Sequence, residues 1–132
     1  MTARDVCSVL LGLCLLPTPA ARADNAVPGI SEGERFTQQD GESLYRAICQ
    51  SCHMADGRGA QGAGAYPSLA GNAKLANAPY LAYTVLHGRK GMPPFQNLLT
   101  DQQVAEITNF VRTHLGNHAM EPIGASEVKA LR

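Results

Sequence analysis

Two cysteines and a histidine lie within five residues of one another, in the segment Cys49-Gln50-Ser51-Cys52-His53. On a helix, residues three or four apart share a face, so both thiols would point the same way, with His53 one turn beyond Cys49. A disulfide between the two cysteines would close too short a loop to hold a fold together. The segment therefore predicts a group held by two sulfurs and one imidazole.

The first 23 residues have the three-part pattern of a secretory signal peptide. A basic residue precedes an apolar run over residues 6–16, which is too short to span a bilayer, and the small-x-small sequence Ala21-Arg22-Ala23 follows. The alternative is an uncleaved membrane anchor. A lipid anchor on Cys14 is not expected, because the bulky Leu13 precedes it where lipoprotein processing requires a small residue. Cleavage after residue 23 would remove Cys7 and Cys14, two of the four cysteines. Only the pair in the motif would remain, so a disulfide scaffold is not expected.

Charge excludes one class of partner. The 132 residues carry 11 basic and 11 acidic side chains, for zero formal net charge. A nucleic-acid binder neutralises phosphates with a basic stripe, which this sequence lacks. We expect no nucleic-acid partner, and no stable membrane insertion once the signal peptide is cleaved.

Three kinds of site use such a cysteine pair. A thioredoxin-like redox pair requires a preceding strand and a βαβ pattern, and a structural zinc site requires four ligands; the sequence indicates neither. The third is covalent haem attachment, for which C-x-x-C-H is the typical motif. We expect thioether bonds from Cys49 and Cys52 to one haem c per chain, with His53 as the proximal iron ligand.

The opposite face of the iron needs a second ligand in an electron carrier. Met92 is the strongest candidate, because Gly91 and Pro93-Pro94 place it on a rigid extended loop. His87, at the end of a helix, is its rival and would give a site with two imidazoles. The remaining candidates are Met54, which adjoins His53 and cannot reach the opposite face, Met120, His114 and His118.

Helical periodicity predicts an all-α fold without strands. The first helix covers approximately residues 40–50, the second lies between an Asn77 cap and a Gly88 stop, and the third starts at a Thr100/Gln103 capping box and ends before residue 116. Four glycines predict an irregular loop over residues 54–64. We expect residues 24–39 to form a flexible lead-in and residues 119–132 to form a tail, with Ser126 as the candidate cap of a short helical stretch.

The sequence resembles the class I cytochrome c family over roughly residues 40–116. The matching elements are C-Q-S-C-H at 49–53, Y-P-S-L-A-G at 66–71, G-M-P-P-F at 91–95 and I-T-N-F-V-R at 107–112. The resemblance implies a cytochrome c domain over residues 40–118, with helices and loops wrapped around one haem. It implies that Gly41 and Tyr45 cross against Ile107 and Phe110.

Two further roles follow from the same resemblance. The Pro67 carbonyl would accept a hydrogen bond from the second nitrogen of His53, and Leu69 would pack against the haem. Such a bond fixes the imidazole tautomer and increases donation to iron. No residue can be assigned to the haem propionates in the same way.

These expectations favour a periplasmic one-electron carrier over an enzyme. The donor would be a periplasmic dehydrogenase, and the electrons would pass to a downstream redox acceptor towards the respiratory chain. Arg89 and Lys90, beside Met92, would form part of a docking rim. The alternative is a haem enzyme or ligand-binding sensor, peroxidase-like, with a displaceable sixth ligand. The tail could dock on the partner, or it could cover the cytochrome's own surface.

Overall fold

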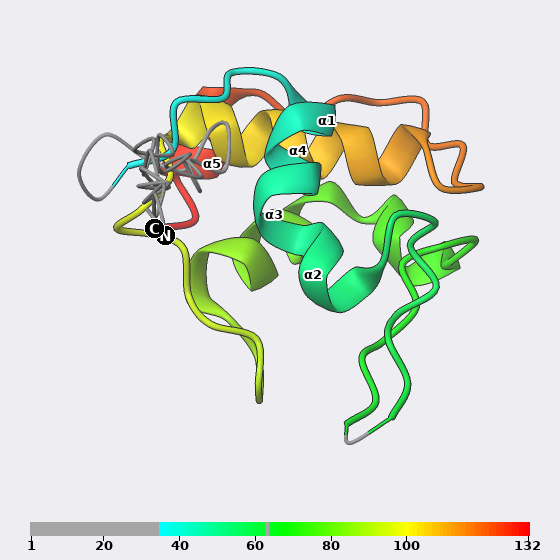
Figure 1. Ribbon diagram of the computed structural model, residues 1–132. Helices are drawn as coiled ribbons and strands as arrows, with labels where there is room; N and C mark the ends of the chain where they lie inside the picture. The colour runs from blue at the N-terminus through cyan, green and yellow to red at the C-terminus, as the bar shows by residue number, and fades with distance from the viewer. Residues whose placement is uncertain (1–34, 63) are drawn as a thin grey trace, which may run out of the picture.

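The computed structural model describes residues 35–62 and 64–132 (Figure 1). The predicted signal peptide and most of the predicted lead-in lie outside the described residues. The described part of the chain is helical and contains no strand, only two isolated bridges, Gln61 with Ala65 and Arg89 with Met92. The all-α prediction is confirmed.

The first helical segment contains three consecutive elements: α1 (Gly41–Leu44), the π-helical turn η1 (Tyr45–Cys49) and α2 (Gln50–His53). Asp40 caps it, since its carboxylate accepts a hydrogen bond from the Ser43 amide at 2.8 Å. The segment ends at Met54, whose φ of 64° leaves the helical region. It therefore runs three residues beyond the predicted end and includes the whole cysteine–histidine motif.

The other two predicted helices are present with the predicted ends. A short 3₁₀ turn, η2 (Ala73–Ala76), precedes α3 (Ala78–His87), which Asn77 caps through the Tyr80 amide and Gly88 ends. In α4 (Asp101–Thr113) the Thr100 hydroxyl accepts from the Gln103 amide at 3.2 Å, and the Gln103 side chain accepts from the Thr100 amide at 2.9 Å. The capping box is thus reciprocal.

The core forms where α1 crosses α4 and α3 packs on the same helix. Gly41 permits the crossing, because a Cβ there would lie 2.3 Å from the Glu106 carbonyl oxygen. Next to it, the rings of Tyr45 and Phe110 lie 5.4 Å apart. The predicted crossing is present, and Ile107 is buried in the same core.

The carboxyl-terminal residues pack on the rest of the chain. A last helix, α5 (Ala125–Lys129), lies against α4 and α3 (Figure 1). Val128 in this helix and Ile123 before it are buried. The predicted Ser126 cap is wrong. The cap is Gly124, whose amide donates to the Glu127 carboxylate at 2.9 Å, so the helix has already begun when the chain reaches Ser126.

None of the helices over residues 35–62 and 64–132 combines the length and the apolar character needed to cross a membrane.

Candidate haem site

The first helical segment brings the two cysteines to the edge of the core. Cys49 ends the π turn, and Cys52 lies in the following α-helical turn. Both thiols are free and partly buried. Burial, with a smaller contribution from Cys52, raises the pKa of Cys49 to about 12. Cys49 is therefore a neutral thiol at ordinary pH, and neither cysteine is engaged in a disulfide.

His53 is buried, with 8% of its surface exposed. Its Nδ1 lies 3.1 Å from the carbonyl oxygen of Pro67, which is the hydrogen bond that the family resemblance implies. Since a carbonyl only accepts, Nδ1 is the nitrogen that carries the proton. No hydrogen-bond partner of Nε2 occurs among residues 35–62 and 64–132. The imidazole is therefore oriented with one nitrogen lone pair free for a metal.

Backbone hydrogen bonds hold the loop that follows the motif against it. The Gly59 amide donates to the His53 carbonyl at 3.0 Å, and the Ala60 amide donates to the Cys52 carbonyl at 2.9 Å. Further along, the Leu69 amide donates to the Gly57 carbonyl at 2.7 Å. Pro67 thus approaches His53 on a loop that is fixed at both ends.

Met92 lies in a tight turn. The Arg89 amide donates to the Met92 carbonyl at 3.1 Å, and the Met92 amide donates back to the Arg89 carbonyl at 3.0 Å. Gly88 makes the turn possible, because its φ is 70° and a Cβ there would lie 2.4 Å from the Met92 oxygen. After the two prolines, the Phe95 amide returns to α3 and donates to the Val85 carbonyl at 3.1 Å. Met92 therefore lies in a hydrogen-bonded turn between α3 and α4, and its role as an iron ligand stays a prediction.

The other candidate ligands have different surroundings. The carbonyl of Met54 accepts from the Tyr45 hydroxyl at 2.8 Å while its side chain is exposed, and Met120 is 89% exposed. His114 stacks on Phe110 with ring centroids 4.6 Å apart. His87 is engaged elsewhere, since its Nε2 lies 2.8 Å from the Leu131 carbonyl oxygen.

These residues fit a covalently held haem. The donor set contains two free thiols, an imidazole with a fixed tautomer and a thioether in a hydrogen-bonded turn. Several partly buried apolar side chains pack against the core and provide an apolar surface for a flat ring. They are Ile48, Leu69, Met92 and Phe95.

A profile of the family described as "Cytochrome C oxidase, cbb3-type, subunit III" matches residues 36–111. The chain belongs to this cytochrome c family. Its members are electron-transfer proteins, and the cofactor of the chain is covalently bound haem c. The predicted resemblance and the predicted cofactor are confirmed.

Several relatives of this cytochrome are subunits of dehydrogenases. The fructose dehydrogenase cytochrome subunit of Gluconobacter japonicus is 38% identical over 108 residues, which cover 70% of the chain and 22% of the relative. The cytochrome c subunit of the quinone alcohol dehydrogenase of Gluconobacter oxydans (strain 621H) is 30% identical over 135 residues, covering 81% and 28%. The chain thus spans about a quarter of the length of these subunits.

A small cytochrome matches over most of its length. Cytochrome c6 of Thermosynechococcus vestitus is 27% identical over 111 residues, which cover 81% of the chain and 86% of the relative. The cytochrome therefore has relatives both among much longer dehydrogenase subunits and among proteins of about its own length.

Sequence reasoning missed Asn117, which supports the Pro67 side of the site. Its side-chain amide donates to the Leu69 and Val111 carbonyls, both at 2.8 Å, and its oxygen accepts from the Asn72 amide at 2.9 Å. It thereby ties residues 69–72 to the end of α4. Only its place directly after Gly116, where α4 has ended, could have drawn attention to it.

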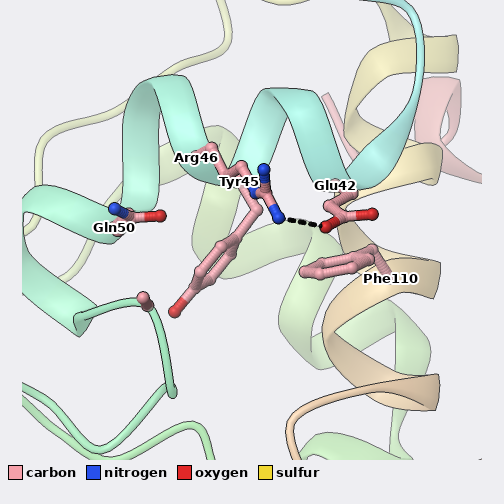
Figure 2. Close-up of a pocket in the computed structure, with 6 residues that line it drawn as sticks. Glu42, Tyr45, Arg46, Gln50 and Phe110 are labelled. Carbon is pink, nitrogen blue, oxygen red and sulfur yellow. Dashed lines mark hydrogen bonds and ion pairs between the residues drawn. The ribbon is translucent and has the colours of Figure 1, made fainter.

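A surface pocket of about 340 Å³ is lined mainly by residues of the first helical segment and by Phe110 of α4 (Figure 2). Its wall contains Tyr45, Phe110 and the ion pair between Arg46 and Glu42, which are 2.6 Å apart. None of the six predicted site residues is among its lining. An exposed pair of this kind contributes little stability.

Proposed function

We propose that the chain is a periplasmic monohaem cytochrome c that accepts electrons one at a time from a dehydrogenase and passes them to a further redox acceptor of the respiratory chain. A bound haem supplies the one-electron iron couple. Cys49 and Cys52 hold it through thioether bonds. His53 and Met92 ligate the iron on its two faces.

The hydrogen bond from His53 to Pro67 is the observation that carries this proposal. It holds the imidazole in one tautomer and increases its donor strength through Nε2. Leu69, two residues after Pro67, lies partly buried at the core and packs against the ring. Met92 supplies a soft thioether, which favours the reduced iron and raises the potential. A saturated iron excludes substrates, which is what a carrier requires.

The dehydrogenase partner is supported by the relatives. The names of the two Gluconobacter proteins describe cytochrome subunits of dehydrogenases. Exposed residues beside Met92 provide a contact rim. Lys90 and Gly91 are exposed there, while Arg89 donates to the Tyr80 hydroxyl at 2.5 Å. Export is supported by the signal-peptide pattern of residues 1–23.

The Met92→Ala variant tests the ligand assignment in the holoprotein. We expect covalent attachment to remain, the weak red absorption band of methionine-ligated ferric haem to disappear, and the reduction potential to fall. Cyanide and imidazole should bind at neutral pH far more readily than to the parent protein. Met120→Ala is the matched control, because that side chain is 89% exposed, and it should leave all three properties unchanged.

An unchanged spectrum in Met92→Ala would remove Met92 from the site. If the parent protein itself lacks the red band and binds cyanide freely, the carrier assignment fails. The peroxidase-like or sensor alternative would then hold.

A further inference from the structure

Leu131 and Arg132 contact the chain on both sides of Met92, which lies in the Met92 loop, defined here as residues 88–100. Before the loop, the Leu131 carbonyl accepts a hydrogen bond from Nε2 of His87, the last residue of α3, at 2.8 Å. On the other side of Met92, Arg132 contacts Gln96 and Leu99 in the second half of the loop, and Asp101 at the start of α4. Both contacts are made by the same short stretch of chain, Leu131 and Arg132.

Arg132 makes a fork of interactions on its side. Its Nε lies 2.5 Å from an oxygen of Asp101, Nη2 donates to the Leu99 carbonyl at 2.9 Å, and Nη1 donates to the Gln96 carbonyl. The ion pair is only about a third exposed, at 32% for Arg132 and 26% for Asp101. A guanidinium that donates to a carboxylate and to two carbonyls fixes their relative positions better than a lysine can.

The stretch that presents these groups is itself well anchored. The side chain of Asn109 makes two hydrogen bonds with the backbone of Ile123, both at 2.9 Å. Arg112 donates to the Glu121 carbonyl at 2.6 Å, and Val128 is fully buried. The end of the chain is therefore a fixed point from which the loop can be held.

We propose that Arg132 and the Leu131 carbonyl form a clamp that positions the Met92 loop and so keeps the Met92 thioether against the iron. The inference rests on the proposed role of Met92 as distal ligand. Arg132 is a positioning residue, since it acts through the Gln96 and Leu99 backbone. Its removal leaves the turn at Arg89–Met92 formed and releases the loop's second stem.

The test is the Arg132→Ala variant of the full holoprotein. Loss of a charge-assisted set of hydrogen bonds shifts a local equilibrium by about tenfold or more. We expect the Gln96 amide, which donates to the Leu86 carbonyl at 3.1 Å, to exchange its hydrogen about tenfold faster. We expect imidazole to displace the sixth ligand with about tenfold higher apparent affinity. Arg132→Lys retains the charge but not the forked hydrogen bonds, so its exchange rate and imidazole affinity should lie between those of Arg132→Ala and of the parent protein.

Two control variants separate the clamp from other effects. Lys129→Ala removes the same charge from an exposed position on α5 and should change neither property. Asn109→Ala detaches Ile123 and should lower global stability without selective exchange at Gln96. Exchange and imidazole affinity in Arg132→Ala equal to those of Lys129→Ala would overturn the clamp. That result would leave the ligand assignment intact, since only Met92→Ala decides it.

Discussion

The Gly41→Ala substitution tests the contact between the first and last helices of the cytochrome domain. The added Cβ would lie 2.3 Å from the Glu106 carbonyl oxygen and 2.6 Å from the Phe110 Cβ. Ordinary van der Waals contact begins at 3.4 Å, so the shortest contact is too close by 1.1 Å. Both neighbouring atoms are fixed to a helix backbone and cannot rotate away. The two helices must therefore separate by about 1 Å, and overpacking of this kind costs about 1–3 kcal/mol.

A competing effect acts in the opposite direction. Alanine is the better helix former by about 1 kcal/mol in a helix interior, and by less at the first helical position that Gly41 occupies. We expect the clash to exceed this gain. The free energy of unfolding of the holoprotein in urea should fall by about 1–3 kcal/mol, which at a typical dependence of about 2 kcal/mol per molar corresponds to a midpoint lower by about 1 M.

Gly64→Ala is the matched control. Its added Cβ would meet nothing closer than the Tyr66 ring at 3.8 Å, so the same chemical change creates no clash. Stability should stay level or rise slightly, because alanine restricts the unfolded chain. If Gly41→Ala were as stable as the parent protein, the close approach of the two helices would not limit stability, and the reasoning would be wrong.

Two further outcomes are expected. Burial is the main cause that raises the pKa of Tyr45 to about 12. The folded protein therefore holds the phenolic proton more tightly than the unfolded chain does. The resulting stabilisation is complete below pH 10 and is lost as the pH rises from about 10 through 12. Tyr45→Phe should abolish that pH dependence of the unfolding free energy and should lower this free energy by about 1 kcal/mol, because the hydrogen bond to Met54 is lost. Tyr83→Phe, at a half-exposed position, is the control. If the pH dependence persisted in Tyr45→Phe, it would come from another group. Asn117→Ala removes three hydrogen bonds and should lower the unfolding free energy, measured in urea, by about 1–3 kcal/mol. Asn97→Ala, at an exposed position, is the control and should leave this free energy nearly unchanged. Equal unfolding free energies for the two variants would contradict the anchoring role of Asn117.

Features that depend on neighbouring residues in the chain could be predicted from the sequence. The Thr100/Gln103 capping box, the Asn77 cap and the Gly88 stop are set by backbone groups within four residues, and all three are present. The bond from His53 to Pro67 spans 14 residues, and family resemblance rather than periodicity predicted it.

Features that depend on distant acceptors could not be predicted. Arg112 is 4% exposed, because the carbonyls of Leu75, Ala76 and Glu121 accept from its guanidinium, and nothing local distinguishes it from a solvated helix cation. The anchoring by Asn117 and Arg132 was missed for the same reason. The π turn at Tyr45–Cys49 was also missed, since hydrophobic spacing over a single turn does not separate it from an α-turn.

That π turn restricts where the chain length can vary. It holds one residue more than an α-turn, directly before the second half of the cysteine–histidine motif. Each residue advances a helix by about 100° of rotation, so losing one residue here would turn Cys52 and His53 by about that angle relative to α4. The imidazole would then face away from Pro67 while the helix itself stayed intact. A change of chain length is therefore not compatible with the five residues that end at Cys49, even though the helix would tolerate it.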